Sequence, residues 1–146
     1  MSKNFKYQED MKAIREQHNC ECPAKHLKAI SHMEAYRFVH EDINHKSNFL
    51  PQLKDEPARF IDNNGKKKCD YLSLSFFTKA ESAKSRFSSL AKTVKNIHKT
   101  LGTHIAVGAL DSNDGLKTED CSSNHFDLYE FEEADLKNKF AIIDKL

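Results

Sequence analysis

The feature that most constrains the fold is an apolar stripe between residues 79 and 100. Apolar side chains recur there at intervals of three and four residues, as they do along one side of an α-helix. Thr78 and Glu81 have the spacing of a capping box, and Gly102 suits a helix end. The pattern predicts one principal amphipathic helix over about 79–100, packed by Phe87, Leu90, Val94 and Ile97.

Segments with strand composition lie on both sides of this helix. Residues 71–77 partly alternate between apolar and polar side chains, and residues 104–110 form a nearly continuous apolar run. Further candidate strands cover 35–39, 126–131 and 140–143. We therefore expect an α+β fold with a small, mostly antiparallel sheet on which the principal helix packs.

The remaining segments differ in character. Residues 1–30 are expected to be a helical N-terminal segment, in which Pro23 begins a second, short helix. Residues 41–68 are polar and interrupted by prolines and Asn63-Asn64-Gly65, so we expect a long surface loop. Hydrophobic residues make up 38% of the chain, which suits one modest core and a single domain over residues 1–146.

The N-terminal residues and the cysteines bear on the compartment. Residues 1–17 hold no continuous apolar stretch that could act as a signal-peptide core or membrane anchor, so we expect a cytoplasmic protein without a membrane partner. The four cysteines are then expected to be reduced thiols. His18, Cys20, Cys22 and His26 are zinc-ligand types, but one residue between the cysteines is poor metal-site spacing. Metal binding there stays open, and no metal ligand is assigned.

Charge is balanced overall but sorted along the chain. Lys and Arg number 23 against 22 Asp and Glu, so no global field indicates a nucleic-acid partner. A nucleic-acid partner stays possible through a local basic patch, but the signal is weak because no nucleic-acid motif is present. The predicted helix nevertheless carries six basic residues against one acid, whereas residues 111–135 hold nine acids against Lys117. One interpretation is a small binding, accessory or regulatory module that docks a protein partner through Lys84, Lys92, Lys95 and Lys99. The other is two solvated faces that differ in sign.

A second interpretation rests on three motifs, Arg37, Ser73-Leu74-Ser75 and Glu130-Phe131-Glu132. Together they resemble the Arg, Ser-x-Ser, Glu-x-Glu pattern of the ADP-ribosyltransferase-like superfamily. The resemblance implies an NAD-consuming transferase or NAD glycohydrolase in which Arg37 contacts the dinucleotide and Ser73 and Ser75 support its pocket. Glu132 would hold the nicotinamide ribose, with Glu130 as the acceptor-side acid. NAD is the only cofactor implied, and only by this interpretation.

These site residues have alternative interpretations. A variant of the same superfamily pattern can be drawn with His40, Tyr71 and Glu130. In a purely structural interpretation, Ser73 and Ser75 lie on the solvent face of a strand, Arg37 pairs with an acid, and both glutamates lie on an exposed edge strand. His125 starts a candidate strand, where it is either a general base near neutral pH or a strand-end side chain.

Overall fold

The computed structural model describes residues 3–23 and 25–146. Its helices are α1 (Gln8–His18), α2 (Gln52–Asp55), the 3-10 helix η1 (Pro57–Phe60), α3 (Gly65–Asp70), α4 (Ala80–Thr93) and α5 (Ile97–Leu101). Its strands are β1 (Lys28–Ala29), β2 (Met33–Val39), β3 (Leu74–Phe77), β4 (His104–Leu110), β5 (Gly115–Lys117), β6 (His125–Glu130) and β7 (Phe140–Lys145). The predicted α+β class is confirmed.

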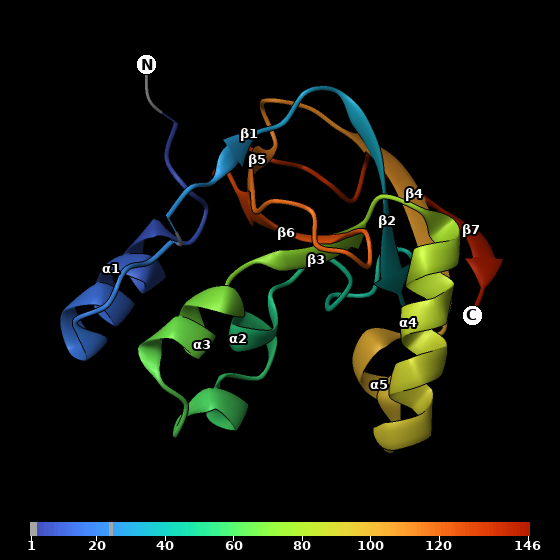
Figure 1. Ribbon diagram of the computed structural model, residues 1–146, viewed down its shortest axis with the longest axis horizontal. Helices are drawn as coiled ribbons and strands as arrows, with labels where there is room; N and C mark the ends of the chain where they lie inside the picture. Colours follow the sequence, from blue (N-terminus) through green and yellow to red (C-terminus); the bar gives the residue numbers. More distant parts are fainter. Residues whose placement is uncertain (1–2, 24) are drawn as a thin grey trace.

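The strands form one sheet in the order β1-β5-β6-β3-β2-β4-β7, with every neighbouring pair antiparallel (Figure 1). β2, β3, β4, β6 and β7 match the five strands predicted from composition and alternation. β1 and β5 were not predicted, because strands of two and three residues are too short to show a period.

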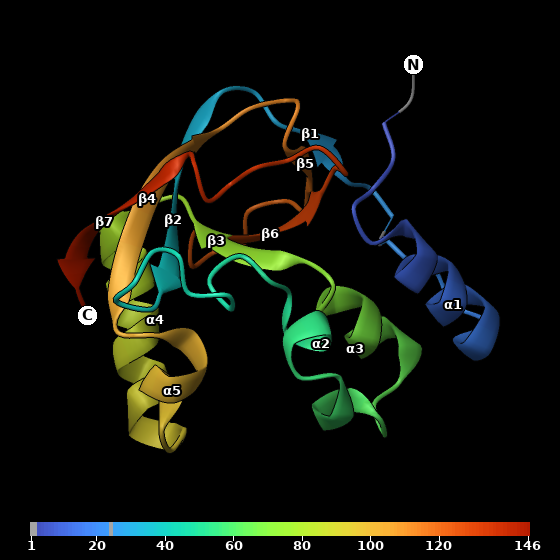
Figure 2. The same ribbon diagram turned by 180° about the vertical axis from the view of Figure 1, so that it is seen from behind.

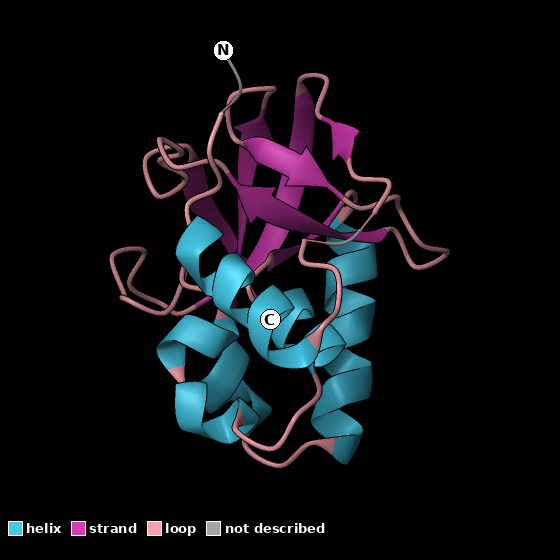
Figure 3. Ribbon diagram, turned by 90° about the vertical axis from the view of Figure 1, so that its left-hand side faces the viewer, coloured by secondary structure: helices cyan, strands magenta, loops and turns pink. Residues whose placement is uncertain are grey.

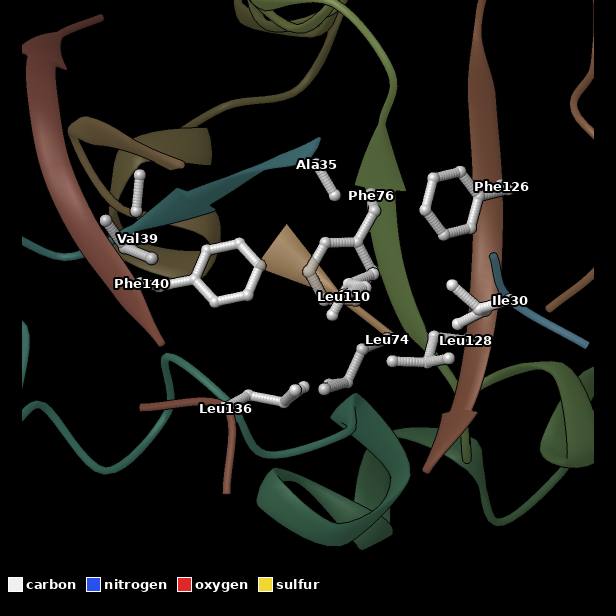
Figure 4. Close-up of a cluster of buried hydrophobic side chains, with 11 residues drawn as sticks. Ile30, Ala35, Val39, Leu74, Phe76, Leu110, Phe126, Leu128, Leu136 and Phe140 are labelled. Carbon is white, nitrogen blue, oxygen red and sulfur yellow. The ribbon is translucent and has the colours of Figure 1, made fainter. Parts of the chain in front are cut away.

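The sheet bends sharply where β2 meets β3. These strands pair only at Tyr36 and Phe77, and in Figure 1 they run in clearly different directions. The bend folds the two halves of the sheet around a shared apolar core, with Phe76 among its fully buried side chains (Figure 4). The other buried members of this core are Ile30, Ala35, Val39, Leu74, Ala106, Leu110, Phe126, Leu128, Leu136 and Phe140.

The helices lie together on one side of the strands (Figure 3). In Figure 2, α4 and α5 lie below one end of β3, and α2 and α3 lie below its other end. α4 packs against β2 and β3 through Ala83, which is fully buried with Phe77 and Ile105. Among the described residues, no helix is long and apolar enough to cross a membrane.

The helix predicted over 79–100 is divided into α4 and α5. Val94 has an extended backbone and Asn96 a left-handed one (φ 59°), so the chain turns before Ile97. Ile97 is buried as predicted, but Phe87 and Leu90 are half-buried and Val94 is 42% exposed. The capping box does not form: Thr78 donates its N–H to the Asn124 carbonyl, and Lys79 caps α4 without a side-chain hydrogen bond.

Two further expectations on local structure were wrong. The segment 41–68 is not a structureless loop, because it contains α2, η1 and the start of α3. Asn64 caps α3 by accepting a hydrogen bond from the Lys67 N–H. Among the described residues of the N-terminal segment there is one helix, α1, and Pro23, which follows a cis peptide bond, lies outside it.

The expectation of four reduced cysteines was also wrong. Cys22 and Cys69 form a disulfide that joins the segment after α1 to α3. Both residues belong to a second apolar cluster with Met11, Ile14, Leu72 and Tyr129. Cys20 and Cys121 are free thiols. Since Cys22 is bonded to another sulfur, it cannot serve as a metal-binding thiolate with its neighbours.

Candidate functional site

A cleft of about 500 Å³ lies between the helices, with β3 and β6 as its floor. α4 and α5 form one wall, and the segments carrying α2, η1 and the end of α3 form the other (Figure 2). This volume is in the range of small-molecule and side-chain pockets. The charged and imidazole side chains that line it are Arg37, His40, Asp55, Arg59, Asp70, Arg86, His125 and Asp127.

The floor follows from the alternation of β3 and β6. Leu74 and Phe76 point into the core, so Ser75 points to the opposite face, and the same period places His125 and Asp127 there on β6. Ser75 lies directly opposite Asp127 in the ladder. Its Oγ donates a hydrogen bond to Asp127 Oδ1 at 3.3 Å.

Asp127 organises this polar floor. Its Oδ1 lies 3.5 Å from His125 Nε2, as well as accepting from Ser75. Burial raises the pKa of Asp127, and His125 and the Ser75 hydroxyl oppose the rise. The Ser75 hydroxyl thus donates to the carboxylate of Asp127, whereas in a Ser-His-Asp triad the serine hydroxyl donates to the imidazole. The contacts with Ser75 and His125 fix the orientation of the Asp127 carboxylate in the floor of the cleft.

Arg37 fills the angle where β2 diverges from β3. Its Nε donates to the Asn48 carbonyl (2.7 Å) and its Nη1 to the Ser75 carbonyl (2.8 Å). The guanidinium carbon lies 5.6 Å from the centre of the Phe76 ring and 6.0 Å from that of Phe49. Burial lowers the pKa of Arg37 to about 10, so the side chain is still charged at neutral pH. The guanidinium is thus held rigidly at the base of the cleft, with only part of its five N–H donors engaged.

The wall near α3 is fixed by local hydrogen bonds. Ser73 Oγ donates to the Asp70 carbonyl at 2.5 Å, which ties the start of β3 to the end of α3. The Tyr71 ring packs on Phe60 with centroids 4.7 Å apart. Ser73 therefore closes a helix end, and Tyr71 is the aromatic side chain that this wall presents.

The wall made by α4 and α5 is apolar with a basic margin. This wall presents four apolar side chains to the cleft, Leu90, Val94, Ile97 and Leu101. The exposed guanidinium of Arg86 lies at its margin. Val94 keeps 42% of its surface exposed, although it is a large apolar residue. This wall can accept an apolar group beside a negative charge.

The sequence-predicted site residues are only partly brought together. Arg37, Ser73, Ser75 and His125 all line the cleft, as do His40 and Tyr71 of the variant pattern. Glu130 and Glu132 are not among its lining residues. The structure therefore separates both glutamates from the arginine and serines with which the superfamily pattern would group them.

Glu130 belongs instead to a buried ion pair with the N-terminal segment. Its Oε2 accepts a hydrogen bond from Lys6 Nζ at 2.8 Å, and its side chain is only 2% exposed. Oε1 has no hydrogen-bond partner among the described residues. Burial raises the pKa of Glu130, and Lys6 opposes the rise. Glu132 is exposed, and its N–H donates to the Asn4 carbonyl.

The charged faces expected from the sequence differ in how far they are neutralised. Five of the nine acids in residues 111–135 pair with lysines that lie elsewhere in the fold or nearby: Asp111 and Asp114 with Lys139, Glu119 with Lys28, Asp120 with Lys117, and Glu130 with Lys6. On the basic side, Lys84 pairs with Asp144. Lys92, Lys95 and Lys99 are exposed and have no ion-pair partner within residues 3–23 and 25–146.

Sequence reasoning missed Asp127, although the signal was present. Asp127 is two residues after His125, so a strand places both side chains on one face. Arg86 was counted only as part of the basic helix. Comparisons with protein-family models, with curated proteins and with solved structures found no match.

Proposed function

We propose that this chain is a binding module that docks an acidic segment of a protein partner. The contact surface is the basic arm, which we define as Arg86, Lys92, Lys95 and Lys99 on and around α4 and α5. The adjacent cleft takes an apolar side chain of the same segment. The observation that carries the proposal is that Lys92, Lys95 and Lys99 have no ion-pair partner among the described residues, whereas most of the opposing acids do.

Charge supports an acidic partner. Internal pairing with lysines neutralises five of the acids in residues 111–135. The negative potential of this segment in the folded chain is therefore weaker than its sequence indicates. The basic arm keeps its charge exposed. An exposed patch of one sign steers an oppositely charged partner, and its effect weakens as salt is added.

The cleft supports an apolar anchor within that partner. Leu90 and Val94 face it from α4 and the turn after it, directly beside Arg86. Interfaces of this kind gain most of their binding energy from one or two apolar or aromatic groups in a pocket, while charged groups at the rim guide association. A partner segment with an aromatic residue among acidic ones matches both features.

The test uses fluorescence anisotropy with a short, labelled, Glu-rich peptide that has one central Phe. Reversing Lys92, Lys95 and Lys99 to Glu should weaken its binding by about tenfold or more, since each exposed charge contact contributes about 0.2–1 kcal/mol. The matched control reverses Lys12, Lys67 and Lys137, which are also exposed and lie outside the basic arm. It changes net charge identically and should weaken binding much less.

Two companion probes separate the arm from the cleft. Replacing the central Phe of the peptide by Ser should weaken binding to the unchanged protein, and a Val94→Asp variant should reduce that difference. A single-stranded DNA probe tests whether the arm binds any polyanion. Equal losses for the two triple variants, or tighter binding of DNA than of the peptide, contradict the proposal.

An NAD-consuming transferase is the second candidate, favoured by one observation. Arg37, Ser73 and Ser75 line one cleft, as the superfamily resemblance implies for an NAD pocket, and His125 lies in the same cleft. The carboxylate beside them is Asp127, in place of Glu132. An N-glycosidic bond needs a carboxylate near its developing positive charge, so Asp127 would take that role here.

Calorimetry with NAD and a nicotinamide-release assay test this candidate. If NAD is cleaved in the cleft, Asp127→Asn should abolish release, Arg37→Ala should weaken NAD binding, and Glu132→Gln should change neither. Loss of release in Glu132→Gln alone would restore the original assignment of Glu132. Absence of NAD binding and of nicotinamide release removes the candidate.

A further inference from the structure

Three of the four cysteines gather around one short helix. Cys69 lies near the end of α3 and is bonded to Cys22, and Cys20 packs against the same cluster of buried side chains. Cys20 Sγ lies directly on Gly65: a Cβ built there would be 2.6 Å from the sulfur. Gly65 and Cys69 are four residues apart on α3, so they lie on one face, separated by about one turn of 5.4 Å.

The three sulfurs differ in access to solvent. Cys22 and Cys69 are 3% and 2% exposed, so a thiol in solution cannot reach their disulfide directly. Cys20 is half-buried and is a free thiol. Its Sγ packs on Gly65, on the helix face that also carries Cys69.

We propose that Cys20, Cys22 and Cys69 form a thiol–disulfide exchange site, in which Cys20 transfers the buried disulfide to a position that small thiols of the glutathione class can attack. This site is separate from the basic arm and does not depend on the proposed docking function. Cys121, the other free thiol, is exposed on the loop before β6 and takes no part.

The first step is an internal exchange. Cys20, which is half-buried, loses its proton to solvent. Its thiolate attacks Cys69 Sγ, the Cys20–Cys69 bond forms, and the Cys22–Cys69 bond breaks. The electron pair of the broken bond stays on Cys22 Sγ, which takes up a proton. The chain keeps one disulfide, so this step requires no oxidant or reductant.

The second step consumes the small thiol. Its thiolate attacks Cys20 Sγ, which leaves a mixed disulfide on Cys20 and releases Cys69 as a thiol. A second thiol molecule attacks that mixed disulfide, releasing the small disulfide and the Cys20 thiol. Two thiols are oxidised and the chain disulfide is reduced. Since Asp70 and Tyr71 follow Cys69 directly and line the cleft, the site adjoins one cleft wall.

The main test is the rate at which reduced glutathione opens the Cys22–Cys69 disulfide in the folded chain. Free thiols are alkylated at intervals, and the modified peptides are counted by mass spectrometry. Cys20→Ser should slow the reaction by about tenfold or more, because the buried disulfide then opens only when the fold does. The matched control is Cys121→Ser, which should react at the rate of the unchanged protein. Equal rates for Cys20→Ser and the unchanged protein overturn the proposal.

The second test identifies the sulfur that is attacked. In a Cys22→Ser variant, air oxidation should join Cys20 to Cys69, as mapped by digestion without reduction. In a Cys69→Ser variant, Cys20 and Cys22 should stay largely unbridged. The proposed attack on Cys69 is contradicted if Cys20 bridges to Cys22 in the Cys69→Ser variant and does not bridge to Cys69 in the Cys22→Ser variant. The rate comparison leaves the native disulfide in place, so it remains decisive where either variant folds poorly.

Discussion

Replacing Lys6 by Met should destabilise the fold strongly, because Lys6 is the only residue in the described part of the chain that pairs with the buried carboxylate of Glu130. Glu130 is 2% exposed, and the Lys6 side chain is 28% exposed. Removing one partner of a buried ion pair costs about 3–5 kcal/mol. Because Lys6 is partly exposed, we expect a cost at the lower end, about 3 kcal/mol. Glu130→Gln should cost only about 1 kcal/mol, since it leaves a neutral group beside a lysine that still donates to the Ala134 carbonyl.

The pH dependence of the Lys6→Met effect gives a second, independent readout. Burial raises the pKa of Glu130, and loss of Lys6 removes the main opposing effect. A carboxyl with a raised pKa binds its proton more tightly in the folded chain, so its contribution favours folding at low pH and is lost as pH rises through the folded pKa. The free energy of unfolding that Lys6→Met loses should therefore be smaller at about pH 5 than at about pH 7. A Lys6→Met, Glu130→Gln double variant should lack this pH dependence.

Urea denaturation of the oxidised protein measures both effects. A cost below about 1 kcal/mol for Lys6→Met at neutral pH would show that Glu130 is not held by this pair. A deficit that is independent of pH would show that Glu130 does not titrate in the folded chain. Either result refutes the structural role assigned to Glu130.

Three more predictions concern packing and covalent structure. Phe76→Ala should cost about 3–5 kcal/mol in urea denaturation, because Phe76 is fully buried against Phe126 and Phe140. Phe87→Ala should cost about half as much, because its ring is only half-buried and packs on Phe38. Equal costs for the two variants would refute the placement of Phe87. Gly102→Ala should lower stability by more than about 1 kcal/mol, seen as a lower Tm, since Gly102 has φ 96° and a Cβ would lie 2.2 Å from the Val39 carbonyl oxygen; an unchanged Tm would contradict this. A Cys22→Ser, Cys69→Ser double variant should lose about 4 kcal/mol, the chain-entropy value for a cross-link spanning 47 residues, and thermal unfolding of oxidised and variant protein with the same Tm would count against the disulfide.

Local pattern was enough to predict the α+β class and five of the seven strands in the described part of the chain. Alternation along residues 71–77 and 126–131 identified β3 and β6. The break between α4 and α5 could not be read from apolar spacing, because the stripe continues through it. The local indication was Asn96, since asparagine enters the left-handed region more readily than most residues.

The errors at the site come from contacts between distant segments. Glu130 keeps the period of β6 and lies on the buried side with Phe126 and Leu128, where Lys6, far away in the sequence, pairs with its carboxylate. Cys22 and Cys69 are 47 residues apart, and no sequence spacing indicates their pairing. The neutralisation of the acidic segment likewise depends on Lys28 and Lys139, which lie outside it. Such partners become visible only once the sheet order is known.

The most direct test of the docking account is an amide chemical-shift map of the isotope-labelled protein during titration with the Glu-rich, Phe-containing peptide. The account predicts that the largest shifts cluster on residues 86–101 and on the cleft floor at Ser75 and Asp127, and that they vanish in the Lys92, Lys95, Lys99 to Glu variant. Shifts centred instead on α1, on β7 or evenly over the surface would contradict the claim that the basic arm and the cleft form the binding site.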